Sequence, residues 1–149
     1  MNKALHFCKI LNQNLSLYSM NDRIDVMEVD FIEAKLQKVD LVFFTPPPYF
    51  GKMDDTSMEE DQYSIFYNIT PDILTILEKA LEISKNVIMI LSNKTDISEL
   101  ALLFWKYFEK KGHIDRISVK IEYFKMNGKL EAYIVYFGNI AEVNFKIFF

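Results

Sequence analysis

A buried strand that stops at a run of prolines is the feature that most constrains this sequence. The apolar run Asp40-Leu41-Val42-Phe43-Phe44 is followed at once by Thr45-Pro46-Pro47-Pro48-Tyr49-Phe50-Gly51. Proline cannot donate to a strand ladder and holds φ at about −65°, so the strand must end at Thr45. Each residue before a proline is pushed to extended geometry, so Thr45, Pro46 and Pro47 should present their carbonyls outward. Outward carbonyls beside an aromatic ring make an amine-binding site possible.

Composition indicates a packed chain of one domain. Of the 149 residues, 50% are hydrophobic and 15% aromatic, which excludes a disordered or low-complexity chain. The length suits one core, so we expect a single domain over residues 1–149. Without a leader or a membrane-length apolar run, we expect an intracellular protein with no membrane partner. A lone Cys8 and the distant His6 and His113 offer no metal-ligand spacing.

Charge is distributed unevenly along the chain. Residues 1–83 carry 7 Lys and Arg against 14 Asp and Glu (−7), and residues 84–149 carry 10 against 7 (+3), which gives the net charge of −4. The second part contains cations that are close in sequence: Lys106, Lys110, Lys111, Arg116, Lys120, Lys125 and Lys129. They could form a phosphate-facing patch, although composition alone favours a solvated helix end and hairpin.

Hydrophobic spacing predicts helices and strands that alternate in the first half of the chain. Residues 4–18 have a helical spacing, and residues 24–29 read as a short strand that ends at Asp30-Phe31. The strand over residues 40–44 comes next. The acidic segment 52–62 has few apolar anchors and should be a mobile loop.

Helix caps and an unbroken apolar run organise the middle of the chain. Thr70-Pro71-Asp72 predicts a helix with Thr70 as its N-cap, which should run to about Ser84. Residues 87–91 form an apolar run typical of a strand covered on both faces. Asp96 and Glu99 then resemble a capping box that opens a second helix. In that helix the lone Trp105 lies on an apolar-rich segment, which favours a core position.

The end of the chain predicts a hairpin. Asn127-Gly128 separates two strand runs, residues 117–125 and 130–137, and is a strong hairpin signal. The alternation over residues 143–149 suggests a last strand or an extended tail. We therefore expect an α/β fold with a mostly parallel sheet and a C-terminal antiparallel hairpin, which is the architecture of S-adenosylmethionine-dependent methyltransferases.

Ligands of such sheets bind outside the carboxyl ends of the strands, where Asp30, Thr45 and Ser92 are expected. Three stretches of the chain also carry the motifs of one family. Residues 23–31 look like a strand that ends in Gly-Asp-Phe, and residues 40–47 look like Asp-Val-Val-Phe-x-Ser-Pro-Pro. Gly128-Lys129-Leu130 and Val135-Tyr136-Phe137-Gly138-Asn139 look like Asn-Lys-Leu and Tyr-Phe-Gly-Asp. In order and over nearly the whole chain, these stretches resemble the trimethylguanosine synthases, the RNA cap guanine-N2 methyltransferases.

The resemblance implies a truncated Rossmann-like methyltransferase fold and a reaction. A methyl group would pass from S-adenosylmethionine to the exocyclic amine of a 7-methylguanosine cap on a small RNA, in the nucleus. Thr45, Pro46 and Pro47 would hold that amine. The family's two prolines are followed at once by a stacking tryptophan, whereas here a third proline intervenes. The resemblance thus implies Tyr49 as the stacking residue, with Phe50 as the second choice.

Further positions follow from the same resemblance. Asp30 would accept a hydrogen bond from the cofactor's adenine amine, with Phe31 and Thr45 beside it, although a loop-capping role explains Asp30 equally well. Ser92 and Asn93 would line the cap pocket, or instead cap the next helix.

One part of the family pattern is missing. The family's glycine-rich cofactor loop has no counterpart, because the four glycines of this chain are far apart. The sequence thus looks like the domain without its first strand and that loop, and the isolated chain is expected to bind S-adenosylmethionine weakly or not at all. The strands that end at Asp30 and Thr45 would then pair directly, dock elsewhere, or meet a second copy or a partner chain.

Two other interpretations of the chain remain open. It could be a catalytically degenerate methyltransferase-like subunit or a binding protein without its own cofactor site. The prolines could also be a polyproline ligand, although their position after a buried strand argues against this.

Overall fold

The structure is a computed structural model that describes residues 3–46, 63–110 and 117–143. The chain forms two compact units, Met1–Lys35 and Leu36–Phe149, and each is described by itself. The predicted loop over residues 52–62 and most of the predicted tail over residues 143–149 lie outside the described residues.

The first unit contains α1 (Lys3–Leu17), which confirms the helix expected over residues 4–18. The helix ends where Ser19 takes a positive φ of 53°. The Met20 N–H then donates to the Leu15 carbonyl at 2.9 Å, as in a helix C-cap. Among the side chains of this helix that the structure describes, Leu15 is buried, with 8% of its surface exposed.

The prediction of a strand over residues 24–29 is wrong. These residues have no regular secondary structure, and Ile24, Met27 and Val29 are 43%, 63% and 56% exposed. A strand is stable only when its N–H and C=O groups pair with a neighbour, and no other strand is described in this unit. Residues 24–29 therefore do not form a strand in spite of their β propensity, and Asp30 does not follow a strand.

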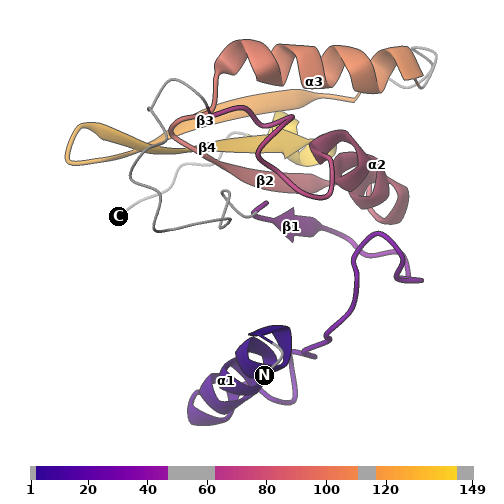
Figure 1. The fold of residues 1–149 in the computed structure, drawn as a ribbon, viewed down its shortest axis with the longest axis vertical. Helices are drawn as coiled ribbons and strands as arrows, with labels where there is room; N and C mark the ends of the chain where they lie inside the picture. The colour runs from indigo at the N-terminus through magenta and orange to yellow at the C-terminus, as the bar shows by residue number, and fades with distance from the viewer. Residues whose placement is uncertain (1–2, 47–62, 111–116, 144–149) are drawn as a thin grey trace. The chain divides into compact units, whose positions relative to one another are not determined.

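The second unit is built on a four-stranded sheet in the order β1-β2-β4-β3 (Figure 1). Its strands are β1 (Val42–Phe44), β2 (Val87–Ser92), β3 (Val119–Met126) and β4 (Lys129–Phe137). β1 pairs with β2 in parallel, and β4 is antiparallel to both β2 and β3. The α/β class is confirmed, but the described sheet is mixed instead of mostly parallel, because residues 24–29 add no parallel strand.

Two helices cover one face of this sheet. They are α2 (Ile73–Ile83) and α3 (Ile97–Lys110). Every second residue of β2 and β4 points toward the helices, and Met89 and Val135 at such positions are fully buried. Leu77 of α2 and Leu100 of α3 are fully buried as well.

Trp105 was expected in the core, but 59% of its surface is exposed. Leu103 and Tyr107 share the buried side of α3, and Trp105 lies about 200° around the helix from Leu103. The position of Trp105 around the helix, and not the size of its ring, therefore determines that it is exposed.

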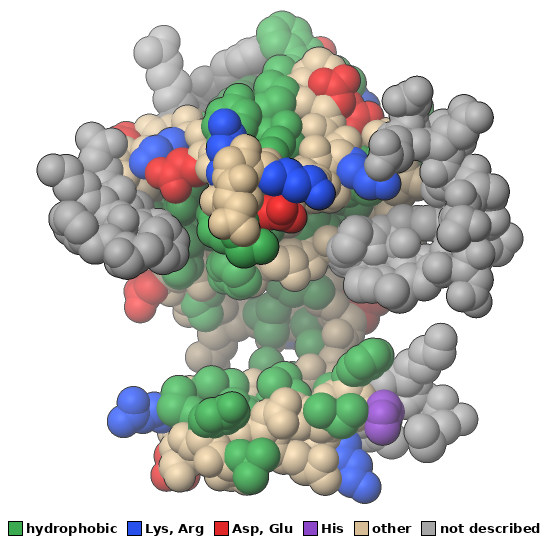
Figure 2. Space-filling model, turned by 90° about the vertical axis from the view of Figure 1, so that its left-hand side faces the viewer, with side chains coloured by type: hydrophobic (Ala, Val, Ile, Leu, Met, Phe, Trp, Pro, Cys, Tyr) green, Lys and Arg blue, Asp and Glu red, His purple; other side chains and the backbone are tan. Residues whose placement is uncertain are grey.

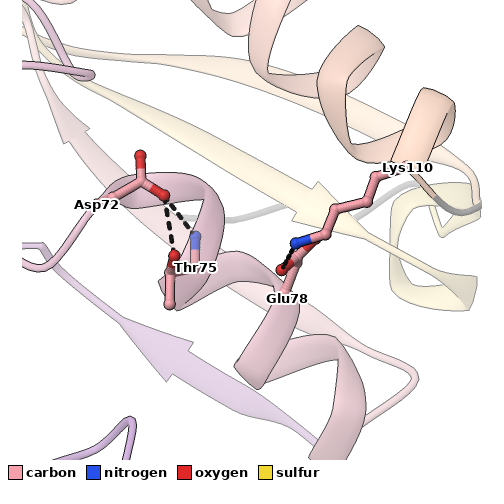
Figure 3. Close-up of polar contacts among 4 residues, drawn as sticks. All are labelled: Asp72, Thr75, Glu78 and Lys110. Carbon is pink, nitrogen blue, oxygen red and sulfur yellow. Dashed lines mark hydrogen bonds and ion pairs between the residues drawn. The ribbon is translucent and has the colours of Figure 1, made fainter.

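The cap of α2 differs from the prediction. Asp72, not Thr70, is the N-cap, and its carboxylate accepts hydrogen bonds from the Thr75 N–H at 2.9 Å and from the Thr75 hydroxyl at 3.0 Å (Figure 3). Aspartate at this position satisfies an N–H that has no partner inside the helix. Further along, Glu78 forms an ion pair of 2.7 Å with Lys110, which joins α2 to α3.

The hairpin is confirmed at its predicted turn. Asn127 and Gly128 have φ of 52° and 80°, as a two-residue turn between twisted strands requires. At the other end of β4, Gly138 has φ of 84° and lies so close to the chain before β2 that an added Cβ would sit 1.8 Å from the Lys85 carbonyl oxygen. Glycine is therefore required at this position, where the short helix η2 (Asn139–Glu142) begins.

Candidate functional site

The proline segment begins at the carboxyl end of β1, as predicted. β1 ends at Phe44; Thr45 is exposed and Pro46 is buried. Thr45 is therefore accessible to a ligand at the edge of the sheet where ligands of α/β folds bind. Pro47, Tyr49 and Phe50 lie outside the described residues.

Ser92 and Asn93 lie at the carboxyl end of the neighbouring strand, where their polar groups stabilise the chain. The Ser92 hydroxyl accepts a hydrogen bond from the Lys94 N–H at 3.2 Å, and its carbonyl accepts one from the Thr95 N–H at 3.0 Å. The Asn93 amide donates to the Leu130 carbonyl at 3.1 Å, which ties this turn to the hairpin. These contacts stabilise the turn and the hairpin and do not cap the next helix, which begins at Ile97, and Asn93 remains exposed.

Asp30 and Phe31 belong to the first unit, whereas Thr45 belongs to the second. The Asp30 carboxylate accepts hydrogen bonds from the N–H groups of Ile32 at 2.8 Å and Glu33 at 3.3 Å. An aspartate that binds the N–H groups of the following turn is a common loop device. The loop-capping role proposed as an alternative for Asp30 is thus present.

The sequence did not predict the position of residues 63–66, which are held by the start of α3. Glu99 was assigned to a capping box, and Asp96 does accept a hydrogen bond from the Ser98 N–H at 2.8 Å. The Glu99 carboxylate instead accepts hydrogen bonds from the Ser64 hydroxyl and from the Ile65 N–H, the latter at 2.9 Å. Glu99 therefore holds residues 64–65 against the start of α3.

One further contact holds this segment, which contains Tyr63 and Phe66. The Lys106 ammonium lies 4.5 Å from the centre of the Phe66 ring, a cation–π contact with α3. Burial raises the pKa of Tyr63; the neighbouring Thr95 hydroxyl opposes this shift and the Glu99 carboxylate adds to it.

Thr95 itself is 4% exposed, and its hydroxyl has no well-formed hydrogen bond to any described residue.

The described residues do not fit a cofactor site. A glycine cradle is the feature that lets backbone approach the cofactor, and the two glycines that the structure describes have other roles. Gly128 forms the hairpin turn, and the close approach of Gly138 is to the Lys85 carbonyl of this same chain. Asp30 uses Oδ1 of its carboxylate in its own turn. Within the described ranges, no group of His, Cys, Asp and Glu could hold a metal ion.

Comparison with known proteins identifies the class to which this architecture belongs. A family model described as RNA cap guanine-N2 methyltransferase matches residues 1–140. The chain therefore belongs to the RNA cap guanine-N2 methyltransferase family, a class of methyltransferases that use S-adenosylmethionine and whose substrate is an RNA cap. The resemblance to the trimethylguanosine synthases is thereby confirmed at the level of the family. No curated protein matches the chain closely enough to be counted as a relative. None of the helices described has the length and apolar character needed to cross a membrane.

Proposed function

We propose that this chain binds the 7-methylguanosine cap of a small RNA and holds the exocyclic amine of the guanine for methylation. The match to the family over residues 1–140 carries this proposal. The exposure of Thr45 directly after β1 supports it, because the amine acceptors would start there. Carbonyls of Thr45, Pro46 and Pro47 would accept hydrogen bonds from the N–H groups of the amine and orient its lone pair, so no general base is required to position the nitrogen.

The ring that stacks on the base would be Tyr49, with Phe50 as the second candidate. A 7-methylated guanine carries a positive charge, and an aromatic face attracts such a cation. Ser92 and Asn93 would border this pocket from the end of β2. A nuclear location is part of the same proposal.

Replacement of Tyr49 tests the stacking role. We expect Tyr49→Ala to weaken binding of 7-methylguanosine diphosphate about tenfold, because stacking on a base contributes roughly 1–3 kcal/mol. Calorimetric titration measures the affinity. Tyr67→Ala is a matched control, because Tyr67 is 87% exposed in a turn of the same unit and should leave the affinity unchanged. Equal affinities of Tyr49→Ala and the unmodified chain would contradict the proposal.

A second candidate function is a cap-binding subunit that does not hold the methyl donor itself. One observation favours it: the Asp30 carboxylate is engaged by its own turn, and the described glycines form no cradle. Thr45, Pro46 and Pro47 would then grip the cap without transferring a methyl group, and Asp30, Phe31 and Thr45 would not form a cofactor site.

Titration with S-adenosylmethionine distinguishes the two functions. For the isolated chain we expect no heat of binding at cofactor concentrations up to the millimolar range, because neither glycine of the described ranges forms a cradle for the methionine part. The 7-methylguanosine diphosphate titration serves as the positive control in the same preparation. Micromolar binding of S-adenosylmethionine would overturn this expectation and favour a complete enzyme.

A further inference from the structure

The turn of the β3–β4 hairpin projects beyond the carboxyl ends of β1 and β2 (Figure 1). Ser92, the last residue of β2, pairs with Ala132, whereas the pairing of β3 with β4 continues to Met126 and Lys129. The turn therefore extends about 10 Å past β2, given a rise of about 3.3 Å for each strand residue. It lies at the same end of the sheet as Thr45, beyond the carboxyl ends of β1 and β2.

The hairpin tip, residues 123–129, combines exposed rings with unopposed positive charge. Its sequence is Tyr-Phe-Lys-Met-Asn-Gly-Lys, which has two lysines and no acidic residue in a chain whose net charge is −4. Tyr123 and Phe124 are 57% and 41% exposed, and both lysines are exposed. Adjacent strand residues point to opposite faces, so the tip presents one ring on each face.

A third lysine joins the tip from β2. The hydrogen bond from Asn93 to the Leu130 carbonyl holds the turn after β2 against the hairpin, and exposed Lys94 follows directly. Within the described part of the chain, Lys94, Lys125 and Lys129 form no ion pair, in contrast to Lys120, which lies 2.7 Å from Glu122. Figure 2 looks onto this end of the second unit and shows Lys side chains spread across it among hydrophobic ones, with some Asp and Glu side chains between them.

We infer that the hairpin tip and Lys94 bind the single-stranded RNA that follows the cap. This inference rests on the proposed function, since it concerns the rest of the same substrate. Lys94, Lys125 and Lys129 would contact phosphates, and Tyr123 and Phe124 would stack on bases. Lysines alone would suit any anion, but exposed rings beside them match the bases of an unpaired strand. The hairpin tip lies at the same end of the sheet as Thr45, with β2 between β1 and β4, so RNA that leaves a cap held at Thr45 would reach the tip across the end of β2.

Charge reversal at the tip tests the inference. Lys125→Glu/Lys129→Glu in the full chain should bind a ten-nucleotide RNA at least tenfold more weakly, both with and without a 7-methylguanosine cap. The dependence of log affinity on log salt should flatten by about 1.4, because each phosphate contact on a single strand contributes about 0.7. Binding of 7-methylguanosine diphosphate should not change. Fluorescence anisotropy measures the RNA affinities, and calorimetry measures the affinity for the diphosphate.

Lys38→Glu/Lys85→Glu is the matched control. It makes the same change in net charge at the opposite end of the sheet, where Lys38 donates to the Glu82 carbonyl and Lys85 precedes β2. Equal losses of RNA affinity in the two double variants, or no RNA binding by the unmodified chain, would overturn the inference. If charge reversal unfolds the chain, as circular dichroism would show, Lys125→Gln/Lys129→Gln supplies the same comparison with a smaller expected loss.

Two further measurements separate RNA from other anions and from the cap. Tyr123→Ala should weaken RNA binding severalfold, and Tyr123→Phe should not. If Tyr123→Ala left RNA binding unchanged and the lysine variants weakened binding of a polyglutamate peptide instead, the site would suit an acidic protein and the RNA site would be refuted. The uncapped RNA separates this inference from the proposed function. Loss of cap recognition with retained, lysine-dependent binding of uncapped RNA would refute the proposed function alone.

Discussion

Glu99 joins two parts of the chain that are far apart in sequence. Its two carboxylate oxygens accept hydrogen bonds from Ser64 and Ile65, which are 35 and 34 residues away in sequence. Hydrogen bonds to a charged acceptor are stronger than neutral ones, and Ile65 is fully buried, so an unpaired N–H there would be costly. Glu99 thus fixes the position of residues 64 and 65 against α3.

Removal of this carboxylate should destabilise the second unit. We expect Glu99→Ala to lower the free energy of unfolding by about 1–3 kcal/mol, because it leaves the Ile65 N–H without a partner. Glu99→Gln should cost less, since the amide can still accept from that N–H. Urea denaturation measures both values. Glu109→Ala, an exposed change on the same helix, should be nearly neutral, and an equal effect of Glu99→Ala and Glu109→Ala would show that the tie to residues 64–65 contributes nothing.

At the scale of elements, the strands differ in how many neighbours satisfy their backbone. β4 pairs on both sides, with β2 and with β3, whereas β1 and β3 lie at the two edges of the described sheet. β1 has only three residues, and its Phe43 is 59% exposed. The centre of the sheet should therefore open only with global unfolding, and the edges should open locally.

Hydrogen exchange should follow that order. We expect the amides of β4 between Tyr133 and Phe137 to exchange most slowly and those of residues 125–129 at the hairpin tip to exchange fastest within the hairpin. The reason is that the tip has no third strand beside it. Exchange followed by NMR or mass spectrometry gives the rates. Protection of the tip equal to that of Tyr133–Phe137 would mean that something else covers it.

At the scale of the whole molecule, local sequence signals predicted the elements of the second unit well. The Asn127-Gly128 turn, the apolar run from Val87 and the stop at Thr45 each depend on neighbouring residues only, and the structure has all three. Features that depend on distant partners were not predictable. Glu99 at the third position of a helix looks like a cap until Ser64 and Ile65 are brought to it by the fold.

The candidate site was predictable to the same extent. The sequence placed Thr45 at the carboxyl end of a strand, and the structure agrees. It also placed Asp30 at a strand end, and this was wrong, because residues 24–29 lack the neighbour that a strand needs. The roles of Pro46, Pro47, Tyr49 and Phe50 stay predictions that rest on the family to which the chain belongs.

The double pairing of β4 also limits which insertions and deletions the chain can accept. A shift of one residue in β4 would turn Val135 and Phe137, 0% and 2% exposed, away from the helices and bring Ile134 and Tyr136 into their place. It would break the ladders with β2 and β3 at once. A change in length can be absorbed at the Asn127-Gly128 turn but not between Lys129 and Gly138, so length variation among related sequences should be confined to the turn.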